Sequence, residues 1–326
     1  MSVVASPGSA RVRRRAFPVP LLLLVGSLAL YIGVALWTGQ KSQLDAEGII
    51  GLLQRMVGLG IVGLGQTFVI LCGSIDLSVA NLISVGAVGA SYIMQGNSAM
   101  ILPAVGAVLF IAIFVGAVNG VIIAKLSVNP LIATLGVGLI LQGLLSASFN
   151  DFAGSVPPEF QAVAYGGLGG LPYSVLGLFV LTLLGWQVLR TTRFGAHLYA
   201  VGGNAEGARL AGIRTDFVII LAHVICSVMA GLTGLYLASR LRSGAPWVGR
   251  DGVYDLESIA VVVIGGTLLA GGRGTLVGAI AGAFCLFALF TLLNLVGLPQ
   301  PLKDTAQGLI LISAVASGAY RLRRAG

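Results

Sequence analysis

Long apolar runs separated by short polar segments form the main pattern along this chain. They recur from Pro18 almost to the C-terminus. Runs of about 20 apolar residues are long enough to cross the hydrocarbon core of a bilayer as helices. The pattern predicts ten membrane spans: Pro18–Trp37, Gly48–Cys72, Leu77–Met94, Ile101–Ala124, Pro130–Phe149, Leu171–Leu189, Asp216–Leu237, Leu256–Ala270, Thr275–Val296 and Leu302–Tyr320.

Composition gives the same fold class, an all-α, polytopic bundle of membrane helices. Of the 326 residues, 57% are hydrophobic and only 9% are charged, whereas soluble domains carry about 25% charged residues. The mean hydropathy is +0.99. The three cysteines, Cys72, Cys226 and Cys285, lie within or at the ends of apolar runs and lack the spacing of a disulfide framework or a metal site. The first apolar run is too long for a signal peptide, so we expect it to remain as an uncleaved span.

The charged residues predict the orientation of the chain in the membrane. Arginines cluster within residues 1–17 and again in the tail, residues 321–326. Lys and Arg are enriched on the cytoplasmic side of membrane proteins. With both basic ends in the cytoplasm, most of the remaining basic residues also fall inside, and most acidic residues fall outside. We therefore expect a transmembrane domain over residues 18–320 with both termini cytoplasmic. The net charge of +8 follows this topology and forms no continuous face for nucleic acid.

Glycine is abundant, with 48 copies, and two glycine-containing segments interrupt apolar spans. Small residues let membrane helices approach closely, so we expect Gly116 with Gly120, and Gly274, Gly278 and Gly282, to pack against neighbouring helices. The segments VILCGSIDLS (Val69–Ser78) and VVVIGGTLLA (Val261–Ala270) match in pattern. The match predicts two related halves with parallel repeats, each with a broken helix, as in many transporters.

An acidic residue, Asp76, lies in one of these breaks, between Ser74 and Ser78. Asp and Ser before an apolar run are typical helix N-caps, so Asp76 is expected to accept hydrogen bonds from backbone N–H groups of the helix that starts near Leu77. An intramembrane acid is also a candidate for direct solute contact. His223 stands alone in its predicted span, and we expect it to be packed and hydrogen-bonded rather than a ligand.

Other polar residues in the apolar runs are amides and hydroxyls. Amides bind neutral polyols without the cost of a buried charge, and they also join helices to each other. As a set they favour an uncharged polar solute over an ion. The candidate residues of a solute pathway are Gln66, Asp76, Ser78, Asn81, Asn119, Asn129, Thr134 and Gln142.

The longest predicted inner loop, residues 190–215, contains a Gly-Gly-Asn break. Asn204 is expected to cap a short helix that ends near Gly212, with Glu206 and Arg209 as its polar residues. A short helix on the cytosolic face is a candidate docking element for a soluble partner. A plain amphipathic connector is the alternative.

The residues in these segments resemble permeases of the ribose-type, simple-sugar ABC importers. GSIDLSV (Gly73–Val79) is similar to that family's Gly-Gly-Ile-Asp-Leu-Ser-Val-Gly motif, with Ser74 and Ala80 replacing its second and last glycines. Residues 116–136 and 243–283 resemble further family segments, and the loop resembles the family's coupling segment. The similarity extends from about Gly63 to Gln307.

The resemblance implies a permease for a sugar or a similar small neutral polar solute in a bacterial inner membrane. It implies two ATP-binding cassette subunits, a second permease chain, identical or different, and a periplasmic solute-binding protein as partners. The implied ATPase-coupling residues are Gly203, Asn204, Glu206, Arg209, Leu210 and Gly212. By charge, the candidate residues for docking the binding protein are Arg240, Arg242 and Arg250, with solvated loop charge as the alternative.

The chain lacks a G-x-x-x-x-G-K-[ST] motif, so we expect ATP hydrolysis in a separate subunit and no enzymatic activity or cofactor in this one. Two alternatives remain open. An ABC permease for a nucleoside or a branched-chain amino acid has the same architecture. A secondary transporter coupled to H⁺ or Na⁺ is less favoured, because the predicted spans contain few ionisable residues.

Overall fold

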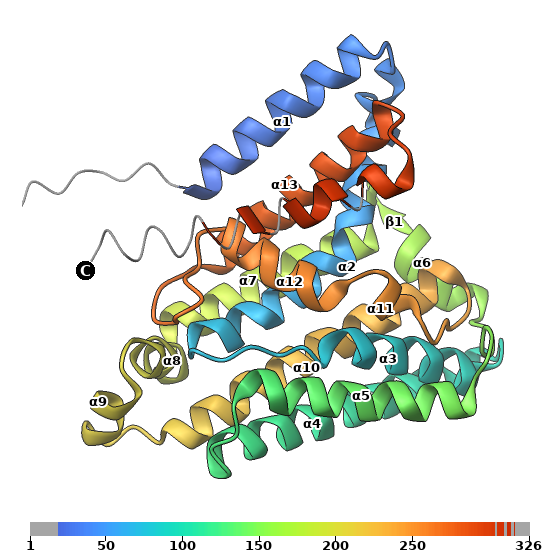
Figure 1. Cartoon of the computed structure of the whole chain (residues 1–326). Helices are drawn as coiled ribbons and strands as arrows, with labels where there is room; N and C mark the ends of the chain where they lie inside the picture. Colours follow the sequence, from blue (N-terminus) through green and yellow to red (C-terminus); the bar gives the residue numbers. More distant parts are fainter. Residues whose placement is uncertain (1–18, 304, 310–311, 314–315, 317–326) are drawn as a thin grey trace, which may run out of the picture.

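Helices make up most of the chain, as Figure 1 shows. The computed structural model describes residues 19–303, 305–309, 312–313 and 316. The predicted basic segments 1–17 and 321–326 lie outside the described residues. The elements in chain order are α1 (Val19–Trp37), η1 (Lys41–Gln43), α2 (Ala46–Leu71), α3 (Val79–Met94), η2 (Ser98–Met100), α4 (Ile101–Lys125), α5 (Pro130–Ser148), α6 (Pro158–Tyr165), β1 (Gly167–Leu168), β2 (Leu171–Pro172), α7 (Tyr173–Thr191), α8 (Arg193–Gly203), α9 (Ala205–Leu210), α10 (Thr215–Leu241), α11 (Val248–Asp251), α12 (Tyr254–Ile264) and α13 (Leu276–Leu295).

Within the described residues, 7 helices are long and apolar enough to cross a membrane, rather than the ten that hydropathy predicts. They are α1, α2, α4, α5, α7, α10 and α13, with η2 continuing into α4. Helix α3, with 16 residues, and α12, with 11 residues, are shorter than the bilayer core requires. The tenth predicted span, Leu302–Tyr320, is described only in part, at residues 302–303, 305–309, 312–313 and 316, all of which are helical.

Helices α2 and α10 form the centre of the bundle. Helix α10 packs against α2, α3 and α4, and α2 also packs against α13 and α12. Both central helices are mostly buried, whereas α1, α5 and α7 expose large apolar side chains such as Ile132 and Phe179 on their outer faces. Such apolar faces are suited to contact with lipid or with another membrane chain, because either contact keeps the apolar side chains away from water.

Glycines bring the central helices into close contact. A methyl group added to Gly116 or Gly120 of α4 would lie 2.6 Å from the Cα of Val224 or 2.5 Å from the Cα of Ile220 on α10. Atoms of these types pack at about 3.5 Å or more, so only glycine fits at both positions. The predicted packing role is confirmed for this pair. On α13 the role is confirmed for Gly278, which lies against Gly265, and for Gly282, which lies against Val261, whereas Gly274 precedes the helix and packs against Thr267 within the second break.

Two non-helical segments interrupt the bundle, and both lie where the sequence predicts a break. The first, Cys72–Ser78, separates α2 from α3, and the second, residues 265–275, separates α12 from α13. The helix predicted over Leu256–Ala270 is therefore wrong in its extent, because it ends at Ile264. Gly266 has φ +91°, a left-handed conformation that ends a helix. Hydropathy alone misses this end, since apolar residues continue to Ala270. The repeat relation between the two halves stays a prediction.

The two ends of the bundle differ. Helices α8 and α9 lie at one end, and α6 with the β1–β2 hairpin lies at the other (Figure 1). The hairpin is a minor addition to the expected all-α fold. At the α9 end, Lys125 of α4 pairs with Asp216 of α10 at 2.6 Å. At the α6 end, the Tyr165 hydroxyl donates to the carbonyl oxygen of Arg240 at 2.6 Å. Lys125, which is predicted to lie inside, and Arg240, which is predicted to lie outside, are thus at opposite ends of the molecule.

Candidate functional site

The first helix break begins with a hydrogen-bonded helix terminus. Gly73 has φ +81°, its N–H donates to the carbonyl oxygen of Ile70 at 2.9 Å, and the N–H of Ser74 donates to that of Val69 at 3.0 Å. This pair of bonds with a left-handed glycine is a Schellman motif, which satisfies the last carbonyl groups of a helix. The chain then has no regular secondary structure from Ser74 to Leu77 before α3 begins at Val79. The local sequence thus creates irregular backbone in the interior of the bundle.

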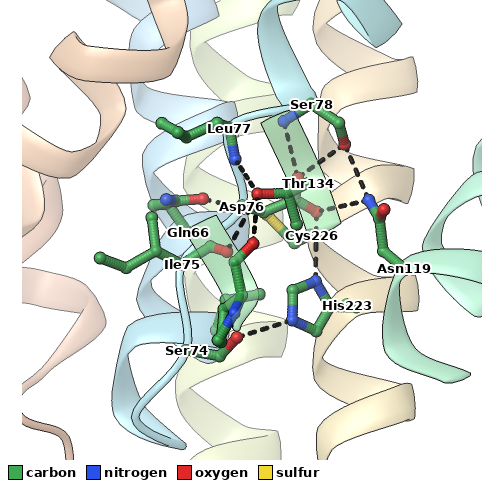
Figure 2. A network of polar contacts seen from close by, with 12 residues as sticks. Gln66, Ser74, Ile75, Asp76, Leu77, Ser78, Asn119, Thr134, His223 and Cys226 are labelled. Carbon is green, nitrogen blue, oxygen red and sulfur yellow. Dashed lines mark hydrogen bonds and ion pairs between the residues drawn. The ribbon is translucent and has the colours of Figure 1, made fainter. Parts of the chain in front are cut away.

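Asp76, in the middle of this break, is fully buried and surrounded by hydrogen-bond donors (Figure 2). Its Oδ1 accepts from the backbone N–H of Ser78 at 2.9 Å and from the Ser78 hydroxyl at 2.6 Å. Its Oδ2 lies 3.4 Å from Nδ2 of Asn119 and 3.3 Å from Nδ1 of His223. Four donors match the acceptor capacity of an ionised carboxylate. The arrangement ties the break to both α4 and α10.

The expected capping interaction of Asp76 is therefore present only in part. The carboxylate does accept from one backbone N–H group at the start of α3, that of Ser78. However, α3 starts at Val79 with Ser78 at the N-cap, so Asp76 lies two residues earlier than a capping residue. The other donors are side chains.

His223 is buried and hydrogen-bonded, as expected from the sequence, but its partners belong to the first break. Its Nε2 lies 2.9 Å from the hydroxyl of Ser74, and its Nδ1 faces Asp76 (Figure 2). The imidazole ring thus joins Ser74 to Asp76 across the break. Sequence reasoning thus missed Ser74 and His223 as members of the site. The sequence did contain one indication of this pairing. An unpaired charge inside a membrane is energetically costly, so a buried aspartate predicts a polar partner, and His223 is a candidate for that partner.

Helix α5 closes the other side of the break. The Thr134 hydroxyl accepts from the N–H of Leu77 at 3.0 Å and donates to the carbonyl oxygen of Pro130 at 2.8 Å. Gly138, one turn further along, packs against Ser78. Thr134 therefore supplies a hydrogen-bond acceptor for a backbone N–H group that the helix break leaves without an intrahelical partner.

The predicted pathway residues separate into four groups. Asp76, Ser78, Asn119 and Thr134 form the buried network, which we call the Asp76 network together with Ser74 and His223. Gln66 lies beside it, with Oε1 3.4 Å from Sγ of Cys226 and with Nε2 unpartnered among the described residues.

The other three predicted pathway residues lie elsewhere. Asn81 and Gln142 line a separate cavity. Asn129 is exposed and caps α5, because its Oδ1 accepts from the N–H of Leu131 at 2.9 Å. The structure therefore does not bring Asn129 together with the others.

The loop expected to dock a soluble partner contains the predicted short helix. Asn204 caps α9, accepting from the N–H of Gly207 at 2.8 Å, and the helix covers Ala205–Leu210. Gly212 follows with φ +82° and ends this turn. On the exposed surface, Glu206 pairs with Arg209 at 2.9 Å, and Leu210 is 81% exposed. The predicted helix and its cap are confirmed.

A close junction of three glycine-containing segments joins this loop to both helix breaks. A methyl group at Gly202, at the end of α8, would overlap the carbonyl oxygen of Leu71 and lie 2.6 Å from the backbone nitrogen of Gly272. The N–H of Gly272 in turn donates to the Leu71 carbonyl at 3.0 Å. A methyl group at Gly271 would lie 2.9 Å from the oxygen of Gly202. We call Leu71, Gly202, Gly271 and Gly272 the glycine junction.

A tyrosine of α8 adds a second link to the same place. The Tyr199 hydroxyl donates to the carbonyl oxygen of Gly274, in the second break, at 2.9 Å. Burial raises the pKa of Tyr199 above its ordinary value, so the hydroxyl stays protonated and able to donate. Helix α8 is thus fixed to the second break by a side chain as well as by backbone packing.

The arginines predicted to face the outside lie near the α6 end. One Nη of Arg240 lies 3.4 Å from the Tyr236 hydroxyl, and the Arg242 guanidinium lies 5.4 Å from the centre of the Tyr165 ring. Arg250 pairs with Asp251 at 3.1 Å. Each cation has a local partner, and Arg242 and Arg250 are exposed.

Known proteins give the context for this geometry. No solved structure matches the chain significantly. The ribose import permease protein of Escherichia coli K12 is 36% identical over 275 residues, 82% of this chain and 84% of that protein. The fructose import permease protein of Rhizobium meliloti is 33% identical over 311 residues, 91% of this chain and 84% of that protein. The L-arabinose ABC transporter permease protein of Azospirillum brasilense is 32% identical over 279 residues, 85% of this chain and 81% of that protein.

A family model covers nearly all of the bundle. It is described as branched-chain amino acid transport system / permease component, and it matches residues 48–315. That range includes both helix breaks, the Asp76 network and α9. The chain therefore belongs to this family of ABC transporter permeases, the membrane components of import systems, which are not catalytic themselves.

Proposed function

We propose that this chain is the membrane permease of an ATP-driven importer for a neutral sugar in a bacterial inner membrane. The observation that carries the proposal is the similarity of most of the chain to permeases named for ribose, L-arabinose and fructose. A further relative is named for autoinducer 2.

An amino acid is the main alternative solute, because the family description names branched-chain amino acids. A zwitterion needs a charged group of each sign, or strong dipoles, along a dry pathway. The carboxylate of Asp76 and the ring of His223 bind each other, so neither is free for an ammonium or a carboxylate group. This pairing favours the uncharged solute.

We assign the docking of the ATP-binding cassette partner to α9 and its flanking residues. The helix is capped, exposed and placed at one end of the bundle. Its exposed Leu210 side chain can bury apolar surface against a partner protein. The coupling residues are those predicted from the sequence, Gly203, Asn204, Glu206, Arg209, Leu210 and Gly212.

The glycine junction gives a physical route from α9 to the membrane interior. Helix α9 follows α8 directly, and the end of α8 lies in van der Waals contact with both breaks. Backbone packed against backbone cannot yield by rotating a side chain, so a movement of α8 displaces the breaks as well. We infer that closure of the ATP-binding partners moves α9, and that the breaks then switch the access of the pathway between the two sides.

The proposal also includes the orientation of the chain in the membrane and the positions of its other partners. Both termini lie in the cytoplasm, a second permease chain completes the pathway, and the periplasmic binding protein docks on the α6 end near Arg240, Arg242 and Arg250. Basic residues at the α9 end, namely Lys125, Arg193, Arg209 and Arg214, support this orientation.

Uptake by bacterial cells that express the chain with its ATP-binding and solute-binding partners tests the function. We expect entry of radiolabelled ribose, L-arabinose or fructose that stops when cellular ATP is depleted and continues when an ionophore collapses the ion gradients. Uptake that survives ATP depletion and collapses with the ionophore would identify a secondary transporter instead. Competition by leucine, but by none of the sugars, would identify the amino-acid alternative.

A further inference from the structure

A polar cavity outside the Asp76 network lies between α3, α5 and the segment that precedes α12. Its volume is about 200 Å³. Residues from three separate parts of the chain line it: Asn81, Gln142, Ser146, Phe149, Asn150, Pro246, Trp247 and Arg250. The cavity lies at the end of α5 that is nearer to α6, where we place the outer face.

The polar side chains of this cavity are not used by the fold. Among the described residues, no hydrogen bond involves the side chain of Asn81, Gln142, Ser146 or Asn150. Each amide offers two donors and one acceptor oxygen, and the hydroxyl offers one donor and one acceptor. The Asp76 network differs, because there every oxygen of the carboxylate has partners. Unused, uncharged donors and acceptors around one cavity are suited to a ligand rich in hydroxyl groups.

Aromatic rings form the apolar part of the lining. Trp247 packs edge-to-face against Phe152, with ring centroids 5.3 Å apart, and Phe149 packs against Tyr92 at 5.4 Å. These contacts fix the orientation of the two lining rings. A sugar has apolar C–H faces between its hydroxyl groups, so rings beside amides match both parts of such a molecule.

The walls of the cavity are held in place by the helix that follows the first break. Gly249 packs directly on the backbone of Ala80, and its N–H donates to the hydroxyl of Ser84 at 3.0 Å. On the other wall, a methyl group at Gly138 of α5 would lie 3.4 Å from Nδ2 of Asn81. Asn81 is one turn along α3 from Ser78, a member of the Asp76 network. A movement of the break therefore moves the cavity wall.

We propose that this cavity is a binding site for one neutral monosaccharide on its way through the permease, between release at the outer face and passage of the breaks. The proposal rests on the proposed function and adds the place and chemistry of solute contact. Asn81, Gln142, Ser146 and Asn150 hydrogen-bond the hydroxyl groups, and Trp247 covers an apolar face. Arg250 is paired with Asp251, so the site gains little net charge and favours uncharged solutes.

Uptake by cells carrying single variants tests the site. Asn81→Leu and Gln142→Leu place a branched apolar side chain of roughly similar size at each position and remove the hydrogen-bonding groups, and each should lower sugar uptake about fivefold or more, since a hydrogen bond contributes about 1 kcal/mol. Gln142→Asn keeps an amide and should retain more uptake than Gln142→Leu. Asn97→Ala removes an amide from an exposed loop outside the cavity and should leave uptake unchanged. Co-purification of the ATP-binding partner reports that each variant assembles.

A labelling measurement keeps the test decisive if a leucine variant fails to assemble. Ser146 is exposed, so Ser146→Cys in a Cys285→Ser background places a reactive thiol in the cavity without disturbing packing. Ribose, or whichever of the three sugars the wild type imports, should slow its reaction with a maleimide. Wild-type uptake by both leucine variants, or labelling unaffected by the sugar, would overturn the site while leaving the proposed function intact. Wild-type cells that import none of the three sugars would overturn the proposed function, and the sugar site with it.

Discussion

The glycine junction makes Gly202 the position where one added methyl group should disturb transport most. In Gly202→Ala, the new Cβ would overlap the carbonyl oxygen of Leu71 and lie 2.6 Å from the nitrogen of Gly272. Both are backbone atoms, so no side chain can rotate out of the way. Carbon contacts of this kind are about 3.5 Å or longer. The end of α8 must therefore move away from the first break by more than about 1.5 Å, because the new Cβ would lie only 1.8 Å from the carbonyl oxygen of Leu71.

The energy of this change follows from two effects. Inserting a methyl group into a packed interior costs about 1–3 kcal/mol. Separation of the segments also lengthens the hydrogen bond from Gly272 to Leu71, now 3.0 Å, which contributes about 1 kcal/mol. We expect Gly202→Ala to lower the free energy of unfolding of the permease by about 2–4 kcal/mol. The protein should still assemble with its partners, because α9 keeps its cap and its exposed surface.

The assay compares sugar uptake with ATP hydrolysis in the same reconstituted complex. In Gly202→Ala we expect ATP hydrolysis to continue while uptake falls about tenfold, because about 1.4 kcal/mol lost from the coupled movement corresponds to a factor of ten. Gly177→Ala is the matched control for both activities, since a methyl group there meets no atom within 4 Å. Gly203→Ala, where the space is also open, is the control for stability.

Two outcomes would refute this reasoning. Uptake per ATP equal to that of the wild type would show that contact between α8 and the breaks does not carry the movement. Equal loss of stability in Gly202→Ala and Gly203→Ala would show that the cost comes from glycine replacement in general and not from the close approach.

Three further predictions concern the Asp76 network and α9. Asp76→Ala should lower the free energy of unfolding by about 3–5 kcal/mol, because it strands buried donors; unfolding of the purified permease measures this, and a loss below 1 kcal/mol would contradict it. Asn204→Ala should weaken α9 by about 1 kcal/mol and reduce capture of the ATP-binding partner, whereas Asn204→Asp should restore both. Glu206→Ala and Arg209→Ala should each change stability by less than about 1 kcal/mol, since the pair is exposed, yet reduce co-purification of the partner; undiminished co-purification would contradict the assignment of α9.

The features that sequence reasoning predicted correctly rest on local signals. Asn204 caps α9 because a capping residue needs only the N–H groups of the next turn. The first break follows from Gly73, whose positive φ ends α2 within a few residues. Hydropathy finds long spans such as α4 and α10 because the bilayer sets their length.

Other features depend on contacts between distant parts of the chain. The partner of Asp76, His223, is 147 positions away, and no local pattern links them. Gly202 and Gly271 meet only once three segments have packed together. The eighth predicted span is too long because Gly266 adopts a left-handed conformation that ends α12, and at this end Gly265 packs on Gly278, while the hydropathy of the sequence still indicates an apolar run.

The central claim is that this chain moves a neutral sugar only when a separate ATP-binding partner drives it. Sugar accumulation in sealed proteoliposomes with ATP supplied on the partner's side measures this directly. The permease alone should accumulate nothing, and the complete complex with its binding protein should concentrate ribose, L-arabinose or fructose. Accumulation by the permease without its partner would contradict the account.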